Sequence, residues 1–413
     1  MRILIIGAGP AGISVAEHLR ALQPDADQQA DITMISAEPF PPYSPPAMAD
    51  HFLHGRGAAL YWKGTDICER LQVDYRAGTE VHEVDPAAKR VMLADDTALA
   101  FDELVIATGS RLYAPVDGYD LPGVYNFKSL TAAQDLIAHA RDGDVKSAVI
   151  VGAGFIGVEV ALLLAVLGLD VTRIDQQDRV MPGMLDAETA DIVGHALAER
   201  GVRVRTGTQA AAFAGNGRAD ALVLEPGEVI KGDAYVAATG VKPNLEFLAA
   251  AGLDTGWGLR VDDGLCTNIP CIRAAGDAVE TRDRMTGERF VHAIFPNAVA
   301  QARVVAEQLL GYDTRYEGAE SMNSLRHLGI PMIAVGSQTG ETELKIRTGR
   351  HLRKINLTEG RIVGFRLAGD IRGAGVYRSL MLRRVDVSRY GDELLEPGFG
   401  PARLARAVFS QAA

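Results

Sequence analysis

A short glycine pattern that occurs twice constrains the fold of this chain more than any other feature. The pattern reads RILIIGAGPAG near the start and AVIVGAGFIG about 145 residues later. Each copy follows a short apolar, β-prone stretch and precedes a helical pattern, the context in which such glycines bind a dinucleotide. The first glycine permits the turn, the second lets the backbone approach a pyrophosphate, and the third lets helix and strand pack closely. The anion then rests on the helix N-terminus. The glycines are Gly7, Gly9 and Gly12 in the first copy and Gly152, Gly154 and Gly157 in the second.

A second pair of similar segments supports a duplication. FDELVIATG ends at Gly109 and GDAYVAATG ends at Gly240, each about a hundred residues beyond its own glycine pattern. One such glycine pattern alone is a weak signal. Two, each followed by an ATG strand, predict two nucleotide-binding units.

Composition limits the class of protein. A length of 413 residues predicts two or three domains. The net charge of −11 argues against a broad nucleic-acid-binding surface. Only three cysteines occur (Cys68, Cys266 and Cys271), which is typical of a reducing compartment, so we expect a cytoplasmic protein. This chain alone cannot supply a four-cysteine iron–sulfur cluster, and we expect no metal site.

Two apolar runs resemble membrane signals. Residues 1–16 begin like a signal peptide, and residues 148–169 are long enough to span a bilayer. In both, glycines at fixed spacing follow the β-prone residues, and the second run carries Glu159. A buried strand, a turn and a buried helix explain both runs better, so we expect no membrane span.

A carboxylate follows the second strand of each predicted unit. DITMISAE ends with Glu38, which we expect to end that strand, and DVTRID ends with Asp175. An acid at this place accepts both ribose hydroxyls of an adenosine and repels a 2′-phosphate. Asp175 is followed by Gln176 and Gln177, without an adjacent arginine, so we expect NADH to be preferred over NADPH.

Taken together, these motifs resemble the pyridine nucleotide–disulfide oxidoreductase superfamily, in its branch of rubredoxin reductases, nitrite reductases and NADH oxidases. The resemblance covers residues 1 to about 310, and more loosely the remainder. It implies an α/β fold with two Rossmann-like domains, one for FAD and one for NAD(H), and a small C-terminal α+β domain. The implied boundaries are 1–113 and 243–315 for the FAD domain, 114–242 for the NAD(H) domain, and 316–413 for the C-terminal interface domain.

The resemblance also implies the cofactor-binding residues. Asp277, in AAGD, corresponds to the family aspartate that bonds the flavin ribityl chain. The residues expected at the FAD site are Gly7, Gly9, Pro10, Ala11, Gly12, Glu38, Tyr43, Pro46, Val81, Thr108, Gly109, Arg111, Gly276, Asp277, Asn297 and Ala298. Those expected to serve the nicotinamide dinucleotide are Gly152, Gly154, Phe155, Ile156, Gly157, Asp175 and Gly240.

Glu159 is the candidate catalytic residue. It lies two residues beyond Gly157 in an otherwise apolar helix start, where a buried acid without a purpose would be costly. In the family that this chain resembles, a glutamate here lies near the nicotinamide and the flavin. We expect its role to be positioning, because hydride transfer itself needs no general base.

A proline-rich segment, PFPPYSPPAMADHF (residues 39–52), is expected to wall the isoalloxazine. Its five prolines fix φ and remove donors, so we expect neither helix nor sheet interior there. Disulfide-reducing relatives carry a cysteine in this region, and this chain has none. Asp50 stands where a lysine often does, with Lys63 as a weak substitute. Cys68 lies downstream in what we expect to be an amphipathic helix.

The expected function is therefore that of an FAD-dependent NAD(H) oxidoreductase without a redox-active disulfide. It would pass electrons between NADH or NAD⁺ and an external redox protein or partner subunit: an iron–sulfur protein, a rubredoxin-like protein, or a tungsten/iron–sulfur oxidoreductase. Both a homodimer and a hetero-oligomer are compatible with this function. Two alternatives stay open at this point: a freestanding NADH oxidase or disulfide reductase, and a non-catalytic interaction module switched by FAD and NADH.

Overall fold

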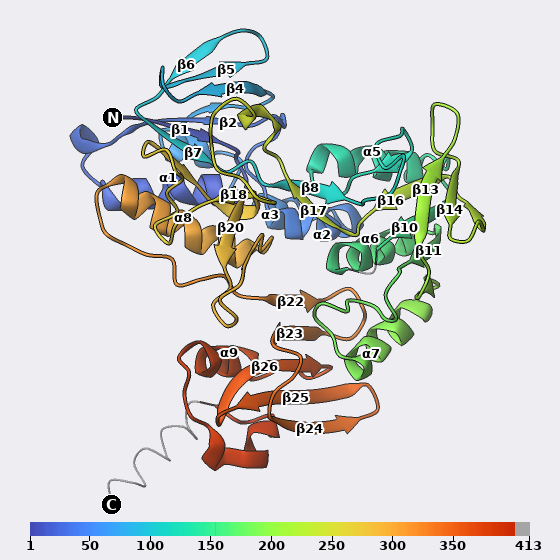
Figure 1. The fold of residues 1–413 in the computed structure, drawn as a ribbon. Helices are drawn as coiled ribbons and strands as arrows, with labels where there is room; N and C mark the ends of the chain where they lie inside the picture. Colours follow the sequence, from blue (N-terminus) through green and yellow to red (C-terminus); the bar gives the residue numbers. More distant parts are fainter. Residues whose placement is uncertain (153, 401–413) are drawn as a thin grey trace, which may run out of the picture. The chain divides into compact units, whose positions relative to one another are not determined.

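The computed structural model describes residues 1–152 and 154–400, which form two compact units (Figure 1). Unit 1 comprises Met1–Ala114, Tyr125–His139 and Gly240–Glu320. Unit 2 comprises Pro115–Val124, Ala140–Thr239 and the chain from Ser321 onward. The boundaries of the three expected domains stay a prediction. Residues 401–413 of the expected C-terminal domain lie outside the described residues.

Unit 1 is built on a five-stranded parallel sheet in the order β19-β7-β1-β2-β3. Its strands are β1 (Arg2–Ile6), β2 (Asp31–Ile35), β3 (Asp74–Arg76), β7 (Glu103–Ile106) and β19 (Ile272–Ala274). The last four residues of β1 are buried, as expected for a parallel strand covered on both faces. Because Ile272 of β19 lies opposite Leu104 of β7, the segment after residue 240 returns to the sheet that the N-terminus begins.

Two long helices of unit 1 pack against each other, α1 (Pro10–Leu22) and α8 (Phe295–Leu309). Each has a proline in its first turn, where a missing N–H costs nothing. The sequence predicts a helix of about fifteen residues opening after Pro296, and the structure begins α8 one residue before that proline.

The rest of unit 1 consists of short elements. Its small sheets contain β4 (Val81–Asp85), β5 (Arg90–Leu93) and β6 (Ala98–Ala100); β8 (Ser110–Tyr113) and β17 (Gly240–Pro243); and β18 (Leu259–Arg260), β20 (Val279–Arg282) and β21 (Arg289–Phe290). Its short helices and 3-10 turns are η1 (Ala26–Gln28), η2 (Pro45–Ala47), α2 (Met48–His54), α3 (Gly57–Leu60), α4 (Ile67–Arg70), η3 (Glu246–Leu248) and η4 (Gly276–Ala278). Strand β9 (Val124–Tyr125) and helix α5 (Leu130–Arg141) lie at the unit boundaries.

Unit 2 begins with a second parallel sheet, in which the strands follow the order β12-β11-β10-β16. These strands are β10 (Ser147–Val151), β11 (Asp170–Ile174), β12 (Arg203–Arg205) and β16 (Ala234–Ala237). Helices α6 (Phe155–Val166) and α7 (Ala187–Ala198) belong to the same part, with the antiparallel strands β13 (Ala210–Ala214), β14 (Ala221–Leu224) and β15 (Val229–Lys231). Asp186 caps α7 by accepting the N–H of Thr189 at 3.0 Å.

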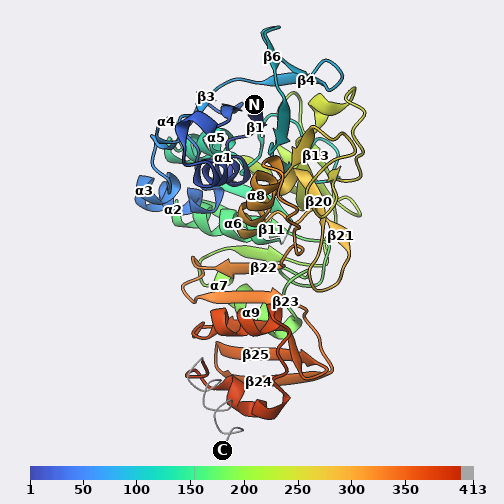
Figure 2. The ribbon, with the colours of Figure 1, turned by 90° about the vertical axis from the view of Figure 1, so that its left-hand side faces the viewer.

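The C-terminal part of unit 2 is an antiparallel sheet in the order β22-β23-β26-β25-β24 with α9 and η5 (Figure 2). The elements are β22 (Met322–Leu325), β23 (Met332–Gly336), β24 (Thr342–Thr348), β25 (His351–Thr358), β26 (Arg361–Ala368), α9 (Ala374–Leu382) and η5 (Ser388–Leu395). Buried charges join this sheet to the chain around α7. Arg366 is fully buried and donates to the carbonyl of Met184 at 2.8 Å. Lys354 lies 3.3 Å from carboxylate oxygens of Asp186 and Glu188.

The proline-rich segment differs from the sequence-based expectation. We expected no helix in residues 39–52, but η2 and then α2 begin there. Pro45 and Pro46 occupy the first positions of η2, where proline is tolerated, and α2 starts at Met48, beyond the last proline. The expectation was wrong because it treated every proline as a helix breaker.

The apolar run at residues 148–169 forms β10, a turn and the 12-residue helix α6. Across residues 1–152 and 154–400, no helix combines the length and the apolar character needed to cross a membrane.

Candidate functional site

The first glycine turn joins β1 to α1, and its three glycines have different surroundings. Gly7 has φ of +108°, and a β-carbon there would lie 2.1 Å from the carbonyl oxygen of Ala107. A β-carbon at Gly12 would lie 1.9 Å from the oxygen of Gly7. A β-carbon at Gly9, by contrast, would meet nothing within 4 Å. The turn therefore requires the outer glycines for its own backbone and leaves open space at the middle one.

This open space lies at the N-terminus of α1. Gly9 is the N-cap and offers no side chain to the free N–H groups of the first turn, which begins with Pro10 and Ala11. Unpaired N–H groups beside open space suit the pyrophosphate of a dinucleotide. The residues present thus fit the cofactor that the sequence predicts.

The second turn, between β10 and α6, repeats this arrangement. Gly152 has φ of +111°, and its β-carbon would lie 2.3 Å from the oxygen of Ala238. A β-carbon at Gly157 would lie 2.6 Å from the oxygen of Gly152, whereas Gly154 has only one atom, at 3.9 Å. Phe155 and Ile156 form the first turn of α6 and are half-buried. Gly240, expected at the same site, begins β17 and belongs to unit 1.

We expected Glu38 to end β2, but the strand ends at Ile35. The Glu38 carboxylate lies in the following loop and has partners within unit 1. Oε1 accepts the N–H and the hydroxyl of Thr131, both at 2.9 Å, and Oε2 accepts the Tyr43 hydroxyl at 2.5 Å. Burial, together with the Glu38 charge, holds the pKa of Tyr43 well above its usual range. Oε1 thus already accepts two hydrogen bonds and Oε2 accepts one, which leaves one acceptor position on Oε2 for a ribose hydroxyl. The contact with both ribose hydroxyls stays a prediction.

Asp175 lies one residue beyond the end of β11. Its N–H donates to the carbonyl of Arg205, and its Oδ1 accepts the N–H of Gln177 at 2.7 Å. This local turn orients the carboxylate immediately after the strand. The ribose contact that we predict for Asp175 requires such a position.

A polar network fixes the end of the first ATG strand. Thr108 and Asn244 exchange two hydrogen bonds, and Asn244 also accepts a hydrogen bond from Arg111 at 2.9 Å. Gly109 has φ of +66° and accepts the N–H of Asn244. Arg111 also pairs with Glu246. The sequence analysis did not predict Asn244, although PN follows the second ATG segment closely.

Asp277 lies in η4, directly after Gly276. Its Oδ2 accepts hydrogen bonds from Lys128 at 2.5 Å and from Ser110 at 3.0 Å, and the Asp277 and Lys128 side chains are less than one-fifth exposed. Gly276 has φ of +79° and approaches Ala11 of α1 closely. The structure therefore places Gly276 and Asp277, two residues predicted at the FAD site, near the first glycine turn. It also adds Lys128, which the sequence analysis did not predict.

Asn297 and Ala298 lie in the first turn of α8. The Asn297 amide exchanges hydrogen bonds with the backbone of Glu320, at 3.0 Å each. The N–H groups of both Asn297 and Ala298 donate to the carbonyl of Ile294. Each residue thus has internal partners, and contact with the flavin stays a prediction.

Glu159, the candidate catalytic residue, pairs with a histidine from the C-terminal sheet. Its Oε2 lies 2.8 Å from Nδ1 of His327, in the loop between β22 and β23. Both side chains are less than one-fifth exposed. The sequence predicted the glutamate and not its partner. His327 stands in the segment SMNSLRHLGIPMIAVG (residues 321–336), but nothing in its spacing connects it to Glu159.

The residues of the proline-rich segment differ in burial, and Met48, Ala49 and Phe52 are buried. Tyr43 is half-buried, Pro46 is exposed, and Phe52 of α2 packs against Phe127 with ring centroids 6.1 Å apart. Val81, the first residue of β4, is half-buried. The expected contact of these residues with the isoalloxazine stays a prediction.

The charged residues that we compared with the family lysine have other partners. Asp50 is 3.9 Å from Arg56, and Lys63 pairs with Glu17 of α1 at 3.0 Å. Lys63 is therefore held by α1.

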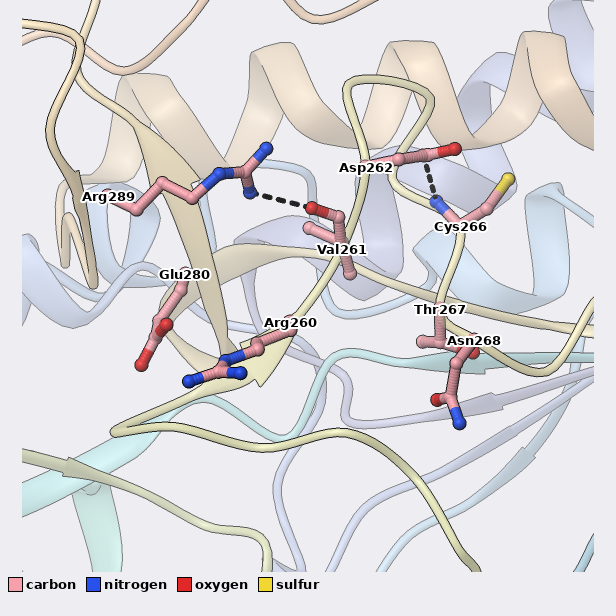
Figure 3. Close-up of a pocket in the computed structure, with 8 residues that line it drawn as sticks. All are labelled: Arg260, Val261, Asp262, Cys266, Thr267, Asn268, Glu280 and Arg289. Carbon is pink, nitrogen blue, oxygen red and sulfur yellow. Dashed lines mark hydrogen bonds between the residues drawn. The ribbon is translucent and has the colours of Figure 1, made fainter.

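All three cysteines are free thiols. Cys68 lies in α4 within the core of unit 1, and burial raises its pKa to about 11. Cys266 lines a surface hollow of about 430 Å³, whose lining also includes Arg260 and Arg289 (Figure 3). Burial raises its pKa as well. This hollow shares no residue with either glycine turn, and we assign no cofactor to it.

Comparison with known proteins agrees with this geometry. Residues 1–302 match the family model described as pyridine nucleotide-disulphide oxidoreductase. A phenylglyoxylate dehydrogenase subunit epsilon, NADH-dependent, from Aromatoleum evansii is 28% identical over 99% of this chain and 97% of its own length. The rhodocoxin reductase of Rhodococcus erythropolis is 35% identical, over 76% of this chain and 74% of its own.

Solved structures show the same fold. A ferredoxin reductase for the CYP199A2 system of Rhodopseudomonas palustris superposes with a TM-score of 0.84 at 27% identity, over 96% of this chain and 98% of that one. The putidaredoxin reductase–putidaredoxin covalent complex gives a TM-score of 0.83 at 25% identity, over 96% of this chain and 97% of that one.

Proposed function

This chain belongs to the pyridine nucleotide-disulphide oxidoreductase family, and we propose that it exchanges electrons between NADH and a one-electron redox protein or partner subunit. It is an FAD-dependent NAD(H) oxidoreductase of mixed α/β fold. The observation that carries the proposal concerns thiols. Residues 39–52 contain no cysteine, and Cys68 is buried with a raised pKa, so at neutral pH it is not a thiolate nucleophile.

The described residues supply binding and orientation. The N-terminus of α1 would hold the pyrophosphate of FAD, and Asp277 would bind its ribityl chain with support from Lys128. The N-terminus of α6 would hold the pyrophosphate of NADH, Asp175 its adenosine ribose, and Glu159 would position the nicotinamide. Bound FAD would accept two electrons as hydride and release them singly or in pairs.

His327 supports the positioning role of Glu159. A half-buried carboxylate without a partner would be costly, and the imidazole 2.8 Å away offsets that cost. The contact also joins the start of α6 to the C-terminal sheet within unit 2.

The names of the relatives support an external electron partner. One relative matched over almost all of both chains is a dehydrogenase subunit, and others are reductases named for rhodocoxin, ferredoxin and rubredoxin. We therefore infer that an iron–sulfur protein or an iron–sulfur subunit is the partner of this chain. NADH as substrate and three unpaired cysteines support a cytoplasmic location.

Acceptor kinetics test the proposal. The FAD-loaded protein should oxidise NADH with a one-electron dye or a small iron–sulfur protein at least about tenfold faster than with dioxygen. Equal rates with dioxygen would instead favour a freestanding oxidase. Absence of flavin reduction by NADH would support the non-catalytic module. Subunits that copurify from the native host would identify the partner.

Cofactor choice is tested separately with Asp175→Ala. Loss of one or two charge-assisted hydrogen bonds should shift the ratio of kcat/KM for NADH and NADPH by about 1–2 kcal/mol, or roughly 5- to 30-fold. Asp178→Ala, at an exposed neighbour, is the matched control and should leave the ratio unchanged. An unchanged ratio in Asp175→Ala would mean that this acid is not at the ribose.

A further inference from the structure

An arginine is buried directly beneath the second glycine turn. Arg173 lies on β11, and only 1% of its surface is exposed. Its Nη2 donates to the carbonyl of Gly152 at 3.0 Å. A β-carbon at Gly157 would lie 3.5 Å from the same Nη2. The guanidinium therefore lies against both outer glycines of the turn that precedes α6.

The charge of Arg173 is only partly compensated. Within residues 1–152 and 154–400, its Nε and Nη1 have no hydrogen-bond partner. Burial lowers the pKa of Arg173 to about 10 and the charge of Asp175 opposes this, so the side chain remains protonated at neutral pH. A buried guanidinium with two of its nitrogens unpaired in the described residues is unfavourable even with the charge of Asp175 nearby. An apolar residue here would avoid that cost.

The first glycine turn shows that the fold does not need this cation. The strand after the first turn reads DITMI and the strand after the second reads DVTRI. Met34 pairs with Ile5 as Arg173 pairs with Ile150, so the two residues hold equivalent positions. Met34 is fully buried. The same turn is thus built over methionine in unit 1 and over arginine in unit 2.

We propose that Arg173 is a positioning residue for the pyrophosphate of NAD(H). It holds the Gly152 carbonyl in place and adds a positive charge beneath the turn, where the N-terminus of α6 receives two negative charges from the ligand. Water is excluded from the side chain, so its field is weakly screened. This inference rests on the assignment of NAD(H) to the second turn and goes beyond it, because the glycine pattern itself does not call for a buried cation.

Direct ligand binding to the FAD-loaded protein tests the proposal. The variant is Arg173→Met, which copies Met34. ADP-ribose and NAD⁺ should bind about 10- to 30-fold more weakly, as expected when one weakly screened charge is removed. The affinity for adenosine, which lacks the pyrophosphate, should change less than about twofold, as measured by calorimetry. High salt should reduce this loss of ADP-ribose affinity only partly, because the charge of Arg173 is buried.

Two controls keep the test decisive. Arg203→Met removes an exposed arginine from the neighbouring strand β12 and should change neither affinity. Arg173→Gln keeps a donor for the Gly152 carbonyl without the charge. It should lose ADP-ribose affinity as Arg173→Met does, and it replaces that variant if Arg173→Met fails to fold.

The proposal fails if Arg173→Gln binds ADP-ribose like wild type, or if ADP-ribose and adenosine weaken equally, since Arg173 would then only brace the turn. A wild-type protein that binds neither NAD⁺ nor ADP-ribose would refute the NAD(H) assignment itself. These two failures are therefore distinguishable.

Discussion

Gly9 and Gly12 are three residues apart in one turn, yet their substitution should have opposite consequences. Gly12→Ala should damage the fold, whereas Gly9→Ala and Gly9→Val should leave the fold intact and damage FAD binding. The contrast follows from what surrounds each α-carbon. It separates a glycine required by the protein backbone from one required by the ligand.

The magnitudes can be worked from the structure. A β-carbon at Gly12 would lie 1.9 Å from the Gly7 oxygen, about 1.5 Å inside ordinary contact. That oxygen belongs to the backbone and cannot rotate away, so the free energy of unfolding should fall by about 3 kcal/mol or more. Gly9 has φ of −71° and ψ of −172°, which any residue adopts, and open space around it. Gly9→Ala should therefore change stability by less than about 0.5 kcal/mol.

Two measurements check this reasoning. Urea unfolding of the apoprotein, followed by circular dichroism, gives the stability of each variant. Quenching of flavin fluorescence gives the dissociation constant for FAD. Valine at position 9 places its methyl groups in the pyrophosphate's approach, so Gly9→Val should bind FAD at least about 100-fold more weakly, or about 2.7 kcal/mol.

Two results would refute the reasoning. One is a folded Gly9→Val protein that retains yellow colour and FAD affinity, because the open space would then not receive the pyrophosphate. The other is equal loss of stability in Gly9→Ala and Gly12→Ala. Gly154→Ala and Gly157→Ala repeat the comparison at the second turn, with NAD⁺ as ligand.

The remaining predictions concern a buried charge and the thiols. Lys354→Met should lower the free energy of unfolding by about 2–3 kcal/mol in urea, because it removes a buried ammonium that lies 3.3 Å from carboxylate oxygens of both Asp186 and Glu188. Burial alone would raise the pKa of Glu188, but hydrogen bonds from basic neighbours lower this pKa to about 2. The stability that Glu188 contributes is therefore fully present above its usual pKa and is lost as the pH falls from about 4.5 toward 2. This loss of stability should be less steep in Lys354→Met. A variant with Cys68, Cys266 and Cys271 replaced by Ala should still reduce a one-electron dye with NADH once folding is verified, and wild type should be reduced by about one equivalent of NADH. A second equivalent, or a folded but inactive triple variant, would show that a thiol participates.

The sequence predicted those features that depend on neighbours along the chain. Both glycine turns, the strands before them and the acid after β11 follow from local patterns. The partners of Asp277 and Glu159 do not, because Lys128 lies 149 residues and His327 lies 168 residues away in sequence. Such pairs are set by how strands and loops meet in three dimensions, and one sequence alone gives no spacing that reveals them.

Arg173 is a different case, because the sequence itself carries its signal. DVTRI is the pattern of a buried strand, and an arginine within it indicates a charge that needs a partner or a function. A charged residue in a buried parallel strand is as informative as a motif, since burial makes an unneeded charge costly.

The duplication allows the two glycine turns of the chain to be compared directly. Both turns satisfy the same backbone requirements at their outer glycines, so whatever differs between them is not needed to build the turn. Beneath the first lies Met34, and after it Glu38 is held by Tyr43 and Thr131. Beneath the second lies Arg173. A ligand that binds and leaves in every cycle gains from a field that does not depend on new protein contacts, whereas a retained cofactor can rely on many contacts formed once. On the assignment proposed above, the buried charge lies beneath the dinucleotide that exchanges, and the retained FAD lies at the turn without it.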